Sequence, residues 1–282
     1  MAYDLFIPEI WSARLLDHLD KAHVYAGLMN RDYEGEIKAY GDTVHINQIG
    51  DVNIFDYDGS DIPDPEELDG EQQSLIIDQA HGFNFQIKDI DNAQTNPKLM
   101  DAAMQRASYD MNDYIDQYLA SLLAAGVDTG NVLADDASPL TPASADEAYD
   151  CLVDLGTILS EANVPRLGRW VVVPPWFHGL LLKDQRFVGY GTDFNKGILQ
   201  GGLVGAAAGF EIYLSNNVPN TDGTLYKVMA GTTAAGTFAE QLVNLEAYRP
   251  EKNFSDALKG LHVYGAKVIQ PKAIAVASCN KS

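Results

Sequence analysis

Residues 96–125, NPKLMDAAMQRASYDMNDYIDQYLASLLAA, form the longest unbroken helical pattern in the chain, and the other segments are organised around them. Apolar side chains recur there every three or four residues and therefore share one side of a helix. Asn96 is a competent N-cap, Pro97 suits the first helical position, and Gly126 is placed to end the helix. We predict a rod of about 40 Å that lies along another part of the fold. The predicted inward set is Met100, Met104, Ala107, Met111, Tyr114, Ile115, Tyr118 and Leu122, and the predicted outward set is Asp101, Gln105, Asp110, Asp113 and Asp116.

Composition excludes several classes of protein. The 282 residues are 46% hydrophobic, enough for a real core, and 19 Lys and Arg against 40 Asp and Glu give a formal charge of -21. This balance argues against a nucleic-acid-binding surface, which needs clustered cations. The start of the chain lacks a signal-peptide pattern, and no apolar run has the length of a membrane span. We expect a protein made and kept in a cytoplasm, with Cys151 and Cys279 as reduced thiols.

Residues 36–90 have the pattern of a long two-stranded excursion. Apolar side chains alternate in the outgoing part, 42–57, and again in the returning part, 73–90. Neither lysine nor arginine occurs between Ala39 and Ile87. An isolated two-stranded ribbon is marginal in water, so we expect it to rest on a partner surface that carries positive charge; a solvated acidic hairpin tip is the alternative. The acids at the tip are Asp56, Asp58, Asp61, Asp64, Glu66, Glu67, Asp69 and Glu71.

A second unit follows a turn-rich linker after the long helix. Ser144 and Glu147 have the spacing of a capping box, which predicts a helix to about Ala162. Strands are predicted at 170–173 and 210–214, a short helix from Pro175, and a strand, turn and strand within 225–240. Two closing strands, 260–268 and 272–277, are expected to return to the unit that holds the long helix. The whole pattern predicts an α+β fold.

Catalytic motifs are weak throughout the sequence. The glycines of 201–209 are not followed by the Gly-Lys-Ser/Thr of a phosphate loop, and the six histidines are scattered without metal-ligand spacing. Carboxylates are too numerous to single out a pair. We therefore predict no catalytic residue, no cofactor and no metal site.

The order of these segments resembles the major capsid protein of tailed bacteriophages with the Hong Kong 97-type fold, over essentially the whole chain. The phrases FIPEIWSARLLDHL and GDTVHINQIGDVNI near the start, and VVVPPWFHGLLLKDQRF later, are similar to wording in that family. The resemblance implies an N-terminal arm at 1–30, an extended loop at 31–91, a peripheral domain at 92–140 and 245–282 with a spine helix, and an axial domain at 141–244.

The resemblance also implies a function. The chain would be a non-enzymatic head subunit that self-assembles into hexamers and pentamers of an icosahedral shell and encloses double-stranded DNA without binding it specifically. It would reside in the virion after assembly in the host cytoplasm, away from any membrane. A portal, a separate scaffolding protein, since the chain starts directly with the arm, and a decoration protein are further candidate partners. Candidate cationic partners for the acidic tip are Arg14, Lys98, Arg106, Lys183, Arg186 and Arg249.

One departure from the family concerns covalent linkage. Some members join subunits through a lysine of the extended loop, but this loop has no lysine between Lys38 and Lys88. We therefore predict no such crosslink at the tip. Two other functions stay open: an encapsulin-like shell around a protein cargo, and a soluble acidic metal-dependent hydrolase.

Overall fold

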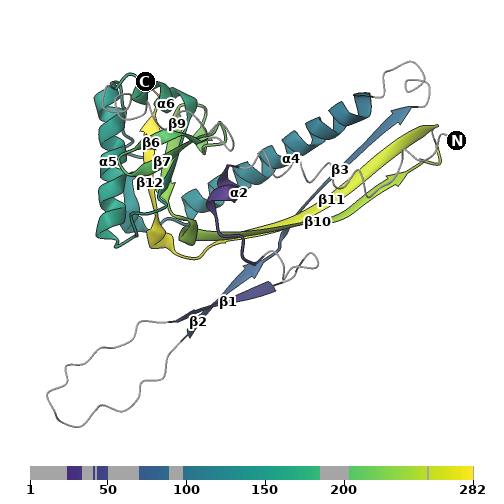
Figure 1. Ribbon diagram of the computed structural model, residues 1–282, viewed down its shortest axis with the longest axis horizontal. Coiled ribbons are helices and arrows are strands. Elements are labelled where there is room, and N and C mark those ends of the chain that lie inside the picture. Colours follow the sequence, from purple (N-terminus) through teal and green to yellow (C-terminus); the bar gives the residue numbers. More distant parts are fainter. Residues whose placement is uncertain are drawn as a thin grey trace, which may run out of the picture.

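A computed structural model describes residues 24–33, 41, 43–49, 70–88, 98–184, 203–252 and 254–281. Two lobes and a projecting hairpin make up this part of the chain (Figure 1). One lobe is a seven-stranded sheet with helices beside it, and the other is an arm in which a long helix lies along a three-stranded sheet. The hairpin leaves the region where the two lobes meet. The structure is therefore of the α+β class, as predicted.

The arm contains the long helix that the sequence predicts. Helix α4 is Lys98–Ala125, and its predicted start at Asn96 and Pro97 lies outside the described residues. It packs on antiparallel strands in the order β10 (Gly236–Tyr248), β11 (Ser255–Val268) and β3 (Gln79–Lys88). Gly126 follows the last residue of the helix and lies close against β11, where a Cβ would come 2.5 Å from a methyl carbon of Val268. One hydrophobic core cluster holds Met104, Met111, Ile115, Leu119 and Leu123 of α4 together with buried residues of these strands.

Two residues of α4 face the opposite way from the prediction. Asp116, predicted outward, is only 3% exposed, whereas Tyr114, predicted inward, is 62% exposed. The reason is a second partner of the helix, the short α2 (Tyr25–Leu28), which contacts α4 beside the sheet. Tyr114 lies at the edge of the buried side, where its ring stacks on His81 with centroids 5.7 Å apart.

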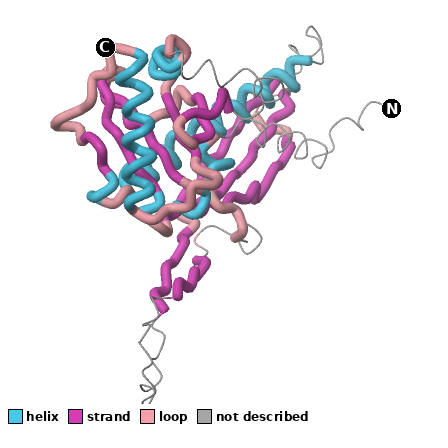
Figure 2. Tube along the Cα trace, turned by 60° about the vertical axis from the view of Figure 1, so that its left-hand side comes forward, coloured by secondary structure: helices cyan, strands magenta, loops and turns pink. Residues whose placement is uncertain are grey.

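The seven-stranded sheet has the order β4, β12, β9, β5, β7, β6, with β8 paired to β9. Figure 2 shows the helices of this lobe against the strands. Predictions for this lobe are confirmed at β5, at β7, at the start of α6 and at the capping box of α5, in which Ser144 and Glu147 bond reciprocally. The elements are β4 (Val132–Ala134), α5 (Ala145–Glu161), β5 (Trp170–Val173), α6 (Pro175–Leu181), β6 (Leu203–Ala207), β7 (Phe210–Leu214), β8 (Asn220–Thr221), β9 (Leu225–Gly231) and β12 (Ile274–Asn280).

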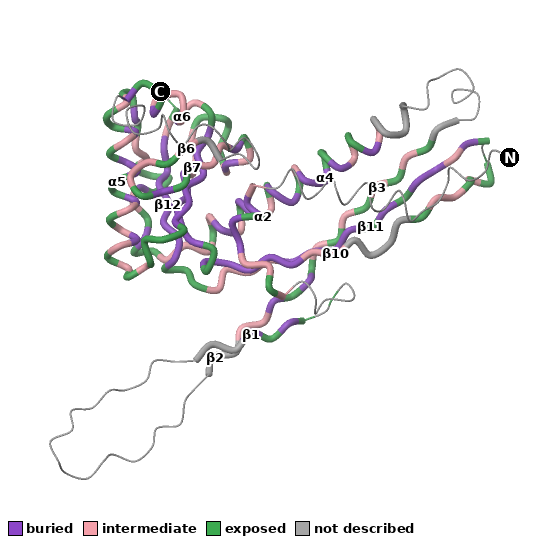
Figure 3. Tube along the Cα trace, viewed as in Figure 1, coloured by how far each residue is buried: buried purple, intermediate pink, exposed green. Residues whose placement is uncertain are grey.

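Alternation along these strands divides the core into two layers. Val171, Val173 and Phe177 belong to a cluster with α5 and α6, whereas Trp170 and Val172 belong to the cluster that contains α4. Figure 3 shows buried residues in both lobes, and the cluster that contains α4 includes Trp170 and Val172 of this sheet together with Leu258 and Tyr264 of β11. One continuous core therefore joins the second lobe to the arm.

The closing strands separate into the two sheets. Only β11 returns to α4 as expected, whereas β12 pairs with β9 and β4 in the other lobe. Strand β10 runs unbroken across the expected boundary after Asn244. Two short 3₁₀ turns, η4 (Thr233–Ala235) and η5 (Pro271–Ala273), connect the sheets and lie against each other. Three hydrogen bonds join these connectors: from Thr232 N to Ala273 O at 3.3 Å, and from Ile269 N and Gln270 N to Ala235 O at 2.9 and 3.0 Å.

The excursion is two-stranded as predicted, but its returning strand is shorter. β1 (Thr43–Ile49) pairs with β2 (Gly70–Ile76) in antiparallel register from Thr43↔Ile76 to Ile49↔Gly70. The predicted continuation of that strand is β3, which joins β11 instead. The alternation of Phe83 and Phe85 places their rings against α4 rather than against β1.

Candidate assembly surfaces

The root of the extended loop, residues 43–46 and 73–77, packs through apolar side chains on the sheet of the arm. Along β11, Leu258 and Tyr264 face α4, whereas Val263 belongs to a separate cluster on the other face of the sheet. The hairpin therefore packs on the face opposite the long helix, because side chains an odd number of positions apart along a strand point to opposite faces. The buried members of this cluster are Val44, Ile46, Leu75, Ile77, Ala239 and Val263.

Two hydrogen bonds attach the root to the body of the subunit, and a third closes the base of the hairpin. The Lys267 ammonium donates to Ser74 O at 3.0 Å, and the Gln73 amide donates to Ile269 O at 3.4 Å. The backbone amide of Gly41 donates to Ile77 O at 2.9 Å. Both bonds to the body are made by β2, and β1 is held through its pairing with β2.

The predicted acidic tip lies almost entirely outside the described residues. Of the tip residues, only Glu71 is among the described ones. It lies in β2 opposite Gln48 of β1, and its side chain is not described. The other tip residues, Asp56, Asp58, Asp61, Asp64, Glu66, Glu67 and Asp69, belong to the part of the chain that the structure leaves out. Arg14 and Arg186 belong there too, as does the side chain of Lys98.

The remaining predicted cations lie on separate parts of the surface. Arg106 of α4 pairs with Asp110 at 3.1 Å and its guanidinium lies over the ring of Tyr109. Arg249, at the far end of the arm, pairs with Asp256 at 3.0 Å. Lys183 is exposed after α6. Within the described residues of one subunit these cations are not brought together.

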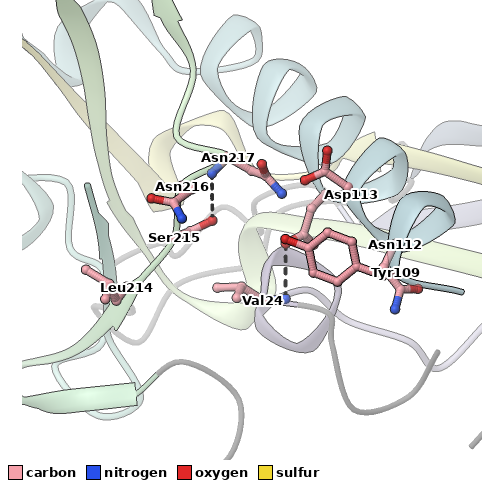
Figure 4. Close-up of a pocket in the computed structure, with 9 residues that line it drawn as sticks. Val24, Tyr109, Asn112, Asp113, Leu214, Ser215, Asn216 and Asn217 are labelled. Carbon is pink, nitrogen blue, oxygen red and sulfur yellow. Dashed lines mark hydrogen bonds between the residues drawn. The ribbon is translucent and has the colours of Figure 1, made fainter. Parts of the chain in front are cut away.

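A polar cavity of about 160 Å³ lies where α4 meets the loop that follows β7 (Figure 4). In this cavity Asp116 Oδ2 accepts from the Val24 amide at 3.3 Å, and Ser215 Oγ accepts from the Asn217 amide at 3.0 Å. No group of His, Cys, Asp and Glu suited to a metal ion occurs among the described residues. The cavity suits ordered water, which needs several polar partners in a space of this size. The other lining residues are Tyr109, Asn112, Asp113, Leu214 and Asn216.

Two partly buried arrangements of charged side chains were not evident from the sequence. Glu240 accepts from the Arg31 guanidinium at 2.6 Å, and its other oxygen lies 3.4 Å from Nε2 of His262. Arg169 donates to Pro165 O, Gly156 O and Val164 O near the end of α5, and burial lowers the pKa of its guanidinium. Both arrangements position backbone segments, since their partners come from neighbouring strands or from a helix end.

The described helices are all too short or too polar to cross a membrane. No curated protein matches the sequence. The phage capsid protein family matches residues 72–277. That segment includes most of β2, all of β3 and α4, and most of the seven-stranded sheet.

Solved structures with the same architecture cover most of the chain. A chain from Mycobacterium phage Che8 is 29% identical with a TM-score of 0.71, over 90% of each chain. The capsid of cyanophage P-SCSP1u is 15% identical with a TM-score of 0.70, over 93% of this chain and 89% of that one. The SrpI encapsulin of Synechococcus elongatus is 13% identical with a TM-score of 0.58, over 86% and 83%. The chain belongs to the phage capsid protein family and is a major capsid structural protein with the Hong Kong 97-type fold.

Proposed function

We propose that the extended loop, residues 31–91, is the main lateral contact through which copies of this subunit form hexamers and pentamers of an icosahedral shell around double-stranded DNA. As a phage capsid protein the chain self-assembles and is a component of the virion shell. The observation that carries the proposal is the projection of β1 and β2 from an anchored root. The root of this ribbon is held by its own subunit, but a two-stranded ribbon that extends past its core is marginal in water and gains stability from another surface.

Charge supports a neighbouring subunit as that surface. No Lys or Arg occurs from Ala39 to Ile87, so the acids of the tip have no Lys or Arg near them in the sequence. Arg106 pairs with Asp110 of the same helix, and Arg249, after the end of β10, pairs with Asp256 of β11; both arginine side chains remain largely exposed. Contacts between the acidic tip and cations of a second copy would fix register and speed association more than they would add affinity. The proposed cations are Arg14, Lys98, Arg106, Lys183, Arg186 and Arg249.

The remaining assignments belong to the same proposal. The proposed domain division is an arm at 1–30, the loop at 31–91, a peripheral domain at 92–140 and 245–282, and an axial domain at 141–244. At its boundaries, β3 and all of β10 pair within the sheet of the arm, and β4 and β12 pair within the sheet of the other lobe. The role is purely structural, assembly takes place in the host cytoplasm, and a scaffolding protein and a portal act with the subunit. The net charge of -21 favours a container that does not adhere to its DNA.

The test is removal of the tip without removal of the root. A variant that replaces residues 56–69 by a short Gly-Ser linker keeps β1 and β2, and it should yield folded subunits that form no stable shells. The matched control keeps the length of the loop and replaces the acids of 56–69 by Asn and Gln. It separates the effect of the negative charge from the effect of the loop length. Sedimentation and electron microscopy measure assembly, and shells of normal stability from the linker variant would contradict the proposal.

The contents of the shells decide between a viral head and a protein-filled compartment. Particles purified from infected cells should contain nuclease-protected double-stranded DNA. A single packaged enzyme in place of DNA would favour the encapsulin-like alternative.

A further inference from the structure

Gly265 of β11 lies against the segment through which the chain passes from the hairpin to β3 of the arm. On β11 its Cα faces the segment that links β2 to β3, and an added Cβ would lie 3.0 Å from Ile77 Cα and would overlap Ile76 O. Both atoms belong to backbone, so a side chain at this position displaces the strand itself. Glycine permits this close approach of two backbones.

Lys267 lies two positions further along the same face of β11. Its ammonium donates to Ser74 O at 3.0 Å, and the Gln73 amide reaches back to Ile269 O at 3.4 Å. Gly265 fixes how close the hairpin comes to the sheet, and these two bonds fix the direction in which β2 leaves it. A contact at one point allows rotation, whereas contacts at three successive points do not.

Side-chain burial holds the same geometry. Leu75 and Ile77 are completely buried, whereas Ile76 between them is 53% exposed. A slip of one residue would exchange these faces and would expose both buried side chains. The register of the root is therefore specified before any neighbour is present.

We propose that Gly265 and Lys267 are positioning residues that set the angle of the extended loop, so that each free subunit carries its lateral contact already oriented and this angle helps to set the size of the shell. The inference rests on the proposed role of the loop as the lateral contact. Orientation before contact lowers the entropic cost of binding, because less conformational freedom is lost on assembly.

The experiment compares Gly265→Ala and Lys267→Met with two matched controls. Gly179→Ala introduces the same methyl group in α6, where an added Cβ meets no atom within 4 Å. Lys272→Met removes an exposed ammonium from η5. Hydrogen exchange of the amides of β1 and β2 is measured on free subunits by mass spectrometry. Shell diameters are measured by electron microscopy, and melting temperature and circular dichroism check the fold.

In the wild type and both controls, the amides of β1 and β2 should be protected in the free subunit and the shells should be uniform. Gly265→Ala and Lys267→Met should keep the circular dichroism of the wild type, should exchange these amides about tenfold faster, and should give shells of altered or broadened diameter. A change in folding stability alone would not alter the diameter. If Gly265→Ala fails to fold, Lys267→Met decides the question.

Unprotected hairpin amides in the wild-type free subunit, or wild-type exchange and diameters in the folded variants, would overturn the inference. The tip-replacement variant keeps this result separate from the proposed function. If that variant loses shells while the root variants keep normal diameters, only the role of Gly265 and Lys267 fails. Normal shells from the tip variant remove the lateral-contact role of the loop.

Discussion

Asp116, in the middle of α4, accepts a hydrogen bond of 3.3 Å from the backbone amide of Val24. This bond ties the beginning of the described chain to the long helix, and it does so through a carboxylate that is almost entirely buried. Burial and the charge of Asp116 together raise the pKa of the neighbouring Tyr25 hydroxyl well above its ordinary value. An acid on a helix of this charged protein therefore has an internal partner.

Asp116→Ala should destabilise the free subunit by about 1–3 kcal/mol, because a hydrogen-bonded backbone amide loses its acceptor in a buried place. Asp116→Asn keeps an oxygen at this position and should cost less. Asp113→Ala is the control on the same helix. Asp113 is partly exposed, and it accepts a hydrogen bond from the side chain of Gln117 at 2.7 Å, one turn away on the same helix. Urea unfolding of the three variants measures the difference, and equal losses for Asp113→Ala and Asp116→Ala would contradict the assignment.

Leu119→Ala should cost about 2–5 kcal/mol, the usual range for a large-to-small change in a packed core. Leu119 is fully buried in the cluster that joins α4 to both sheets. Gln117→Ala, on the exposed side of the same helix, should remain within about 0.5 kcal/mol of the wild type. Denaturant midpoints of free subunits test this, and a small effect at Leu119 would show that α4 is not the centre of the core.

Stability should fall above about pH 10, where tyrosine ionises in an unfolded chain. Burial, together with the charges of Tyr118 and Asp78, raises the pKa of Tyr264 to about 12. Between these two values the unfolded state releases a proton that the folded state keeps, so unfolding becomes more favourable as the pH rises. Below pH 10 both states are protonated and Tyr264 contributes no pH dependence.

Melting temperatures from pH 8 to 11.5 measure this effect. Tyr264→Phe should lessen the decline, although it also removes the hydrogen bond between the Tyr264 hydroxyl and Nδ1 of His81, which lowers stability at every pH. Tyr109→Phe changes an exposed ring and should follow the wild type. Parallel curves for Tyr264→Phe and the wild type would assign the decline to other groups.

Shells should dissociate into single chains when boiled in detergent. The extended loop has no lysine between Lys38 and Lys88, so an amide crosslink from its tip cannot form. Denaturing electrophoresis of purified particles with reductant should show one band at the mass of the 30.8 kDa subunit. A ladder of covalent multimers would require a different linking residue.

Local patterns in the sequence predicted most of the elements. The start of α5 follows from the capping box at Ser144 and Glu147, and the long helix follows from spacing alone. These signals lie within a few residues of each other and do not depend on the rest of the fold. For the same reason β5 and the start of α6 at Pro175 were also predicted correctly.

Partners distant in the sequence could not be predicted in this way. Alternation identifies β3 as a strand, but nothing local indicates that Gln79 faces Tyr264 of β11 rather than a residue of β1. Likewise, helical spacing places Asp116 outward unless the position of α2 is known. Gly265 is one of several glycines in strand patterns, and only the crossing of Ile77 identifies its role. The acidic tip and the cations are expected to meet between two copies of the subunit, so the pattern within one sequence does not pair them.

The paired connectors η4 and η5 give the subunit a mechanical property. A pull along the arm is carried by three covalent backbones in parallel, from α4 into β4, from β9 into β10 and from β11 into β12. The hydrogen bonds of Ala235 to Ile269 and Gln270 couple the second and third of these backbones, so these two extend and twist together. Torque on the arm is thereby transmitted to the strands at the centre of the other sheet, and the subunit tilts as one lever instead of flexing at a single joint.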